Sequence, residues 1–178
     1  SYGVHEKDGL VGDNTIKLNT ISGDLRDTYS VAKSSSSIIH SGNNKDNDII
    51  GGPGNDTLRG GKGMDTLFGG AGDDSIIGDT SHDIINGEDG DDTIYGKDGN
   101  DHITCGAGRD WGSGGKGTDK IFGGDSDDDL SGNTGNDIIY GDEGNDILRG
   151  NDGDDQIFGG AGTDWISGGK GIDEIFGG

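Results

Sequence analysis

Residues 51–68 read GGPGNDTLR-GGKGMDTLF, two nonapeptides with the same placement of Gly, Asp and Leu. The frame continues without insertion or deletion to Phe176, which gives fourteen consecutive nonapeptides. Asp fills position 6 in all fourteen, Leu or Ile fills position 8 in thirteen, and Gly fills position 1 in thirteen and position 4 in twelve. A period held this long indicates a repeat architecture in which each unit stacks on its neighbours.

Each nonapeptide divides into a turn and a short strand. Positions 7 to 9 should form the strand, with position 8 pointing inward and positions 7 and 9 outward. Two nonapeptides then make one coil, with a strand on each side and a turn at each edge. We therefore expect an all-β fold, a parallel β-roll (a β-helix or solenoid) of two facing short-stranded sheets across one layer of Ile and Leu.

Glycine at positions 1, 2 and 4 is expected to provide backbone angles that other residues rarely adopt. Asp and Asn are the best substitutes for Gly in such a conformation, and they occupy position 2 at Asp79, Asn133, Asp142 and Asn151. Glu88 and Lys97 fit position 2 less well. The turns should therefore be tight and rich in exposed carbonyl groups.

The composition describes an acidic chain with few core residues. Leu, Ile, Val and Phe make up about 19% of the 178 residues, and the net charge is −22, of which −20 lies in residues 51–178. Such a charge disfavours binding to nucleic acid and to anionic membranes. No apolar stretch approaches the roughly 18 residues that span a membrane, so we expect no membrane insertion by this part of the protein.

The Asp residues at position 6 should form a column along each edge of the roll, about 4.8 Å apart. Without counter-ions these carboxylates repel one another. Calcium accepts six to eight oxygen ligands and takes carboxylates and backbone carbonyls together. Seven turns on each edge leave six gaps, so we expect about twelve intercoil Ca²⁺ sites, whose charge nearly cancels that of the chain.

The pattern GGxGxD followed by x, Leu or Ile, and x resembles the RTX (repeats-in-toxin), or haemolysin-type, calcium-binding repeat of secreted toxins, serralysin-like proteases and lipases. The resemblance covers residues 51–178. It implies type I secretion to an extracellular or cell-surface location, with calcium held by the position-6 Asp and by carbonyls of the Gly-rich turn. The implied carboxylate ligands are Asp56, Asp65, Asp74, Asp83, Asp92, Asp101, Asp110, Asp119, Asp128, Asp137, Asp146, Asp155, Asp164 and Asp173. The implied carbonyl ligands are those of Gly52, Gly54, Gly61, Gly63, Gly70, Gly72, Gly115, Gly117, Gly160 and Gly162.

Three repeats depart from the pattern. The repeat 105–113 has Cys105 at position 1 and Gly112 at position 8, so we expect the core to be weakest there. Ser81 and Ser126 replace Gly at position 4, and their turns are expected to bind calcium less well. The single cysteine excludes an internal disulfide.

Residues 1–50 form a second segment, which we expect to cap the first coil. Asn47–Ile50 resembles a degenerate repeat with Asn in place of Asp, residues 15–18 read as a strand, and residues 34–37 read as a loop. The repeat domain is expected to span 51–178. Because the chain starts without Met and stops inside a repeat, we expect a piece of a longer protein.

The sequence contains no candidate catalytic site. The histidines form no HExxH motif, no Ser lies in GxSxG, and no phosphate-binding loop is present. Asp125–Asp129 is followed by Leu130 where an EF-hand loop needs Gly. Two non-catalytic functions remain open: a calcium-triggered folding and export module of a larger toxin, protease or lipase, or a structural part of a surface-layer protein or adhesin.

One outward row is aromatic. Position 9 of alternate repeats is Phe68, Asn86, Thr104, Phe122, Tyr140, Phe158 and Phe176. These rings either reflect strand propensity or form a surface for a docking domain or for self-association.

Overall fold

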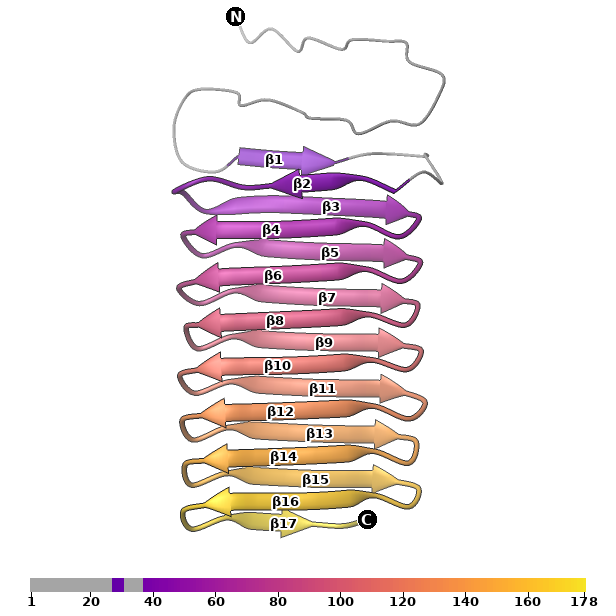
Figure 1. The fold of residues 1–178 in the computed structure, drawn as a ribbon, viewed down its shortest axis with the longest axis vertical. Helices are drawn as coiled ribbons and strands as arrows, with labels where there is room; N and C mark the ends of the chain where they lie inside the picture. The colour runs from indigo at the N-terminus through magenta and orange to yellow at the C-terminus, as the bar shows by residue number, and fades with distance from the viewer. Residues whose placement is uncertain (1–26, 31–36) are drawn as a thin grey trace, which may run out of the picture.

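The computed structural model describes residues 27–30 and 37–178, and these residues contain seventeen strands and no helix. The strands wind into a flat solenoid of two parallel sheets (Figure 1). The nine-stranded sheet contains β1 (Asp27–Ser30), β3 (Asn47–Pro53), β5 (Thr66–Ala71), β7 (Ile84–Asp89), β9 (His102–Ala107), β11 (Lys120–Asp125), β13 (Ile138–Glu143), β15 (Gln156–Ala161) and β17 (Glu174–Phe176). The eight-stranded sheet contains β2 (Ile39–Ser41), β4 (Thr57–Lys62), β6 (Ser75–Thr80), β8 (Thr93–Asp98), β10 (Trp111–Lys116), β12 (Asp129–Thr134), β14 (Ile147–Asp152) and β16 (Trp165–Lys170).

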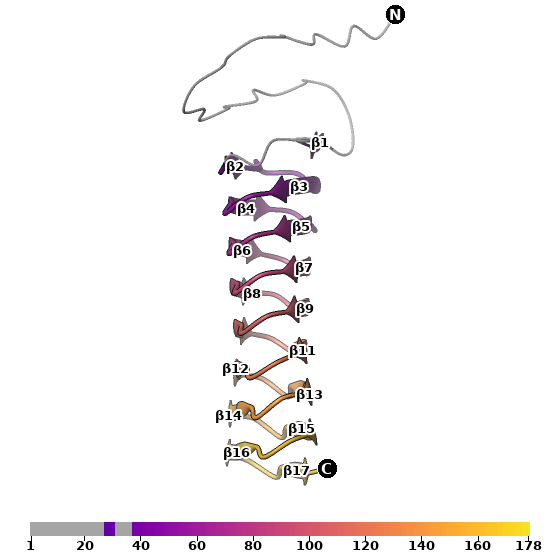
Figure 2. The ribbon, with the colours of Figure 1, turned by 90° about the vertical axis from the view of Figure 1, so that its right-hand side faces the viewer.

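The pairing confirms the two-nonapeptide coil. Each repeat strand pairs with the strand 18 residues further along, as Leu58 pairs with Ile76 and Ile121 with Ile139. Odd-numbered strands therefore stack on one side of the roll and even-numbered strands on the other, with a turn at each edge (Figure 2). The parallel β-roll expected from the repeats is correct.

The strands are longer than positions 7 to 9. Each continues through positions 1 to 3 of the next nonapeptide, so that β4 to β16 have six residues each. The alternation of buried and outward residues also continues, which places positions 8 and 1 inside and positions 7, 9 and 3 outside. Position 1 thus faces the interior beside the position-6 Asp.

The core is one layer of position-8 side chains between the sheets, as expected. From Ile49 to Ile157 the position-8 aliphatic residues are buried, with at most 1% of the side chain exposed. The layer ends in the last coil, where Ile175 is 48% exposed. Because the layer is one side chain thick, every coil depends on the coils directly above and below it.

Backbone angles separate the roles of the glycines. Positions 2 and 4 adopt positive φ throughout most of the array, including non-glycine residues such as Glu88 (φ 77°), Lys97 (φ 89°) and Ser81 (φ 87°). Position 1 does not, so the expectation that Gly there serves backbone angles is wrong. A Cβ on Gly51 would lie 2.5 Å from Oδ2 of Asp56, and the other position-1 glycines are similar. Glycine at thirteen of the fourteen position-1 places therefore leaves room for the carboxylate, and Cys105 is the exception.

The two irregular residues of repeat 105–113 compensate each other. The Cys105 side chain is fully buried at position 1 and joins the hydrophobic layer. A Cβ added to Gly112 would lie 3.0 Å from its Sγ and 2.9 Å from Cδ2 of Leu130. The thiol and Leu130 therefore take the space of the missing position-8 side chain, which revises the expectation of a weak core at this repeat.

The segment before residue 51 joins both sheets. β1 pairs with β3, and β2 pairs with β4. Asn47 occupies the place of the position-6 Asp and is fully buried, as the degenerate repeat predicted. The predicted strand at 15–18 and most of the predicted loop at 34–37 lie outside the described residues.

The aromatic row lies on the nine-stranded sheet. Phe122, Tyr140, Phe158 and Phe176 stack nearly in parallel, with ring centroids 4.9, 4.7 and 4.7 Å apart. Each inner ring is covered on both faces by its neighbours. Stacking accounts for the row without a partner, and docking through it stays a prediction.

Cys105 and Gly112 should be energetically coupled. Gly112→Leu alone should lower the free energy of unfolding by about 1–3 kcal/mol through overpacking against the thiol and Leu130. Cys105→Gly alone should lower it by a similar amount through lost packing. The double variant restores the regular repeat and should recover most of the combined loss in denaturant unfolding at saturating calcium. Simple addition of the two losses would contradict the compensation.

Candidate metal centres

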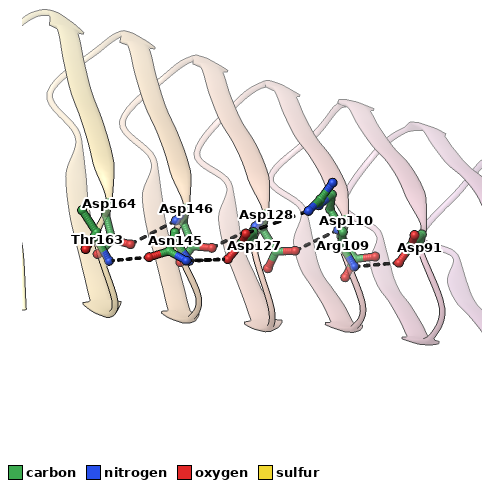
Figure 3. A network of polar contacts seen from close by, with 9 residues as sticks. All are labelled: Asp91, Arg109, Asp110, Asp127, Asp128, Asn145, Asp146, Thr163 and Asp164. Atoms are coloured by element: carbon green, nitrogen blue, oxygen red, sulfur yellow. Dashed lines mark hydrogen bonds and ion pairs between the residues drawn. The ribbon is translucent and has the colours of Figure 1, made fainter.

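The position-6 carboxylates form a buried column along each edge. Oδ1 of each Asp accepts a hydrogen bond from the backbone N–H of the position-6 residue in the preceding coil, at 2.7–3.0 Å. Figure 3 shows this column in the turns after the odd-numbered strands, from Asp110 to Asp164. The first members also receive N–H groups from residues without a carboxylate, since Ile38 donates to Asp56 and Asn47 to Asp65.

The second oxygen of these carboxylates is buried without a hydrogen-bond partner. This holds for Oδ2 of ten residues, Asp74, Asp83, Asp92, Asp101, Asp110, Asp119, Asp128, Asp137, Asp146 and Asp155. Their side chains are 1–3% exposed. A buried charged oxygen without a partner is costly, so each site lacks a positive group.

The pKa values of the position-6 Asp residues reflect the same cost of burying a charged oxygen. Burial, together with neighbouring Asp residues on the same edge, raises the pKa of Asp83 and Asp128 to about 8 against the lowering effect of the backbone hydrogen bond. Burial raises the pKa of Asp92, Asp101 and Asp137 to about 7. In the absence of a cation, these carboxyls of the folded roll therefore keep their protons up to about pH 7.

The position-1 carbonyl of the next coil and Oδ2 of the position-6 Asp lie close to the same point. The place that a Cβ of Gly60 would take is 2.8 Å from the carbonyl oxygen of Gly78 in the next coil and is also in contact with Oδ2 of Asp65. The corresponding place at Gly96 is 2.7 Å from the carbonyl oxygen of Gly114. Position-1 carbonyls were not among the ligands expected from the sequence, because only the coil stacking brings them to this point.

The turns present oxygen atoms because their N–H groups are already used. In the turn 90–93, Gly90 donates to the carbonyl of Ala107 and Thr93 to that of Asp74. The two N–H groups between them donate to side chains, that of Asp91 to Asp73 and that of Asp92 to Asp110. No N–H of this turn is left for an anion, so the turn favours a cation.

The structure places the expected ligands in two groups. Twelve of the fourteen Asp residues, Asp56 to Asp155, are buried in the columns, whereas Asp164 and Asp173 in the last coil are partly exposed. The position-2 and position-4 carbonyls face the same position of the next coil, as those of Gly52 and Gly54 face Gly70 and Gly72. A cation between coils therefore meets carboxylate oxygens on the inside and carbonyls around the turn.

The donor set fits calcium better than zinc. Among the described residues no three His, Cys, Asp or Glu side chains converge as a metal cluster. Any ion between two coils must therefore take part of its shell from backbone carbonyls, which calcium accepts readily and which zinc sites rarely use.

A second ladder at position 5 lies outside the carboxylate columns, and the sequence interpretation missed it. Asp127 accepts the backbone N–H of Asn145 at 2.8 Å, and Asn145 accepts that of Thr163 at 3.0 Å (Figure 3). The signal in the sequence was the frequency of Asn and Asp at position 5, nine of the fourteen repeats when His82 is included.

No helix in the described residues is long and apolar enough to cross a membrane. No curated protein matches the chain. The family model for the RTX calcium-binding nonapeptide repeat matches residues 41–76, 68–103, 104–139, 131–166 and 140–175. These matches cover most of the chain and follow the coils from β2 to β17. The chain belongs to the RTX calcium-binding nonapeptide repeat family.

Proposed function

We propose that this roll is a calcium-triggered folding module of a larger secreted protein, in which about twelve Ca²⁺ ions between the coils convert a disordered acidic chain into the folded array. The observation that supports the proposal most strongly is the column of buried carboxylates whose Oδ2 atoms have no partner. Calcium ligation then contributes directly to folding free energy, because the sites exist only when coils are stacked.

The proposed ligands are the position-6 Asp residues together with turn carbonyls at positions 1, 2 and 4. Twelve gaps are bounded by an Asp on both sides, and in each of them a carboxylate already crosses the gap. The gaps beside Ile38 and Asn47 have only one Asp and should bind calcium weakly.

RTX repeats are structural rather than catalytic and typically occur in secreted proteins. Low calcium inside the cell would keep the chain unfolded during export, and high calcium outside would fold it. The alternative is that the roll is itself the product, as a rigid part of a surface-layer protein or adhesin. The sequence that surrounds these repeats in the complete protein separates the two.

Far-ultraviolet circular dichroism tests the folding switch directly. In excess EDTA at pH 7.5 the chain should be disordered, and calcium at about 5 mM, above the roughly 0.1–1 mM dissociation constants of extracellular sites, should restore the β signal. Magnesium at the same concentration should not, because it dehydrates reluctantly and demands octahedral geometry. A chain that is equally β-rich in EDTA would refute the proposal.

A matched pair of variants separates the effect of losing a buried carboxylate from the effect of changing the net charge. Asp128→Asn should raise the calcium concentration at the folding midpoint, since it keeps the acceptor for the Asp110 N–H but removes the orphaned oxygen. Asp152→Asn removes the same charge from a side chain that is 51% exposed and should leave the midpoint nearly unchanged. Equal shifts would point to net charge alone.

Folding without calcium should depend on pH, whereas the calcium midpoint should hardly depend on it near neutral pH. The folded pKa values of about 7–8 at Asp83, Asp92 and Asp128 lie above the unfolded value of about 3.9. The metal-free roll is therefore most stable below about pH 4 and loses this stability as the pH rises to about 8. Calcium-coupled folding starts from an unfolded chain whose carboxyls are already ionised above about pH 5, so the calcium midpoint should stay nearly constant between pH 6 and 8, while acidification toward about pH 4 in EDTA should increase the β signal. An EDTA sample whose circular dichroism does not change on acidification would contradict the assignment.

Carboxylates on one edge should act together. The N–H of Asp101 donates to Oδ1 of Asp119 at 2.8 Å, whereas Asp110 lies on the opposite edge and bonds to Asp92 and Asp128. Double-variant cycles of calcium midpoints should give a larger coupling for Asp101→Ala with Asp119→Ala than for Asp101→Ala with Asp110→Ala. Similar coupling in both pairs would count against separate ligand columns.

A further inference from the structure

The outer ladder at position 5 links successive turns through side chains. After the odd-numbered strands, the acceptors are Asn55, Asp73, Asp91, Asp127 and Asn145, each of which receives the position-5 N–H of the following coil at 2.8–3.2 Å. After the even-numbered strands, the acceptors are Asp46, His82, Asn100, Asn136 and Asp154, at 2.6–3.0 Å. Both edges of the roll therefore carry the same ladder of position-5 hydrogen bonds.

The two ladders have opposite directions. The position-6 side chain accepts an N–H from the preceding coil, as Asp119 does from Asp101. The position-5 side chain accepts an N–H from the following coil, as Asn100 does from Thr118. A gap with both ladders is thus crossed by two side-chain hydrogen bonds, one from each side, which fixes the spacing of the two turns.

The position-5 hydrogen bond also orients a carbonyl. In a trans peptide the N–H of position 5 and the C=O of position 4 point in opposite directions. The N–H of Thr118 points back to Asn100, so the carbonyl of Gly117 must point forward, and it does face Gly135 in the next coil. The carbonyls of Ser81 and Gly135 face the next coil in the same way, although the N–H groups that follow them have no outer acceptor. The outer hydrogen bond therefore restrains a carbonyl direction that the stacked turns already set.

Three of the twelve gaps that are bounded by an Asp on both sides have no outer link. Their upstream position-5 residues are Met64, Arg109 and Thr118, which provide no acceptor for the N–H of the following coil. Across one of these gaps the side chains of Arg109 and Asp127 form an ion pair instead, at 3.9 Å. The array thus contains linked and unlinked gaps on the same edges.

We propose that the position-5 Asn and Asp side chains are positioning residues for the calcium sites. Each restrains the position-4 carbonyl of the following coil in its ligating direction, so that the gap beyond a linked coil binds calcium more tightly than the gap beyond an unlinked coil. The inference rests on the proposed calcium-coupled folding. It assigns a role to residues outside the position-6 column, and it gives different gaps of one array different affinities.

Substitutions in the full 178-residue chain test the role in both directions. Asn100→Ala removes the acceptor of the Thr118 N–H and should raise the calcium midpoint about 2- to 10-fold, the equivalent of one hydrogen bond. Thr118→Ala is the matched control, because its side chain accepts no such bond, and should leave the midpoint unchanged. Thr118→Asn creates the missing link to Asn136 and should lower the midpoint by a similar factor. Asn100→Asp keeps an acceptor and should behave like the wild type.

A second cation separates positioning from a purely structural link. Midpoints are measured with Sr²⁺ as well as Ca²⁺ for the wild type and for Asn100→Ala. A released carbonyl should change the ratio of the two midpoints, whereas a general loss of stability shifts both by the same factor. An unchanged ratio, or equal effects of Asn100→Ala and Thr118→Ala, overturns the inference while calcium-coupled folding survives. Failure of the wild type to need calcium overturns the proposed function instead.

Discussion

The structure depends on carboxylate oxygens that are buried without a hydrogen-bond partner in ten of the described turns. Oδ1 of the position-6 Asp ties its coil to the preceding one, and Oδ2 lies against the position-1 backbone without a partner. Position 1 must be small to admit that oxygen, and the turn must present carbonyls around it. The same carboxylate that joins the coils thus carries a buried charge that opposes folding of the metal-free array as the pH rises.

The columns of position-6 Asp residues end at the coil that contains Ile38 and Asn47. At the N-terminal side, Ile38 and Asn47 stand at position 6, and their N–H groups are still received by Asp56 and Asp65. Each position-6 Asp accepts an N–H from the coil before it. The coil of Ile38 and Asn47 is therefore joined to the next coil without a carboxylate of its own. Because Ile38 and Asn47 are neutral, this coil buries no position-6 charge of its own. The hydrophobic layer continues into this coil through Ile49 and Ile38.

The fold could be predicted from the sequence because the period, the inward position 8 and the Asp at position 6 all agree on one architecture. The extension of the strands through position 3 could not, since Gly-rich segments give no strand signal. The role of Gly at position 1 was misassigned because its neighbour is a side chain five residues away. The compensation between Cys105 and Gly112 and the direction of the position-5 ladder appear only when coils 18 residues apart are stacked.

The 18-residue register restricts how such an array can lengthen during evolution. Inserting one nonapeptide would exchange the outward faces of every later coil, so that the aromatic row on the nine-stranded sheet would cross to the other side. Inserting an even number preserves both faces. The nonapeptides GGKGMDTLF, GGKGTDKIF and GGKGIDEIF recur at residues 60, 114 and 168, a spacing of three complete coils. Phe68, Phe122 and Phe176 consequently lie on one face, as duplication in whole coils requires.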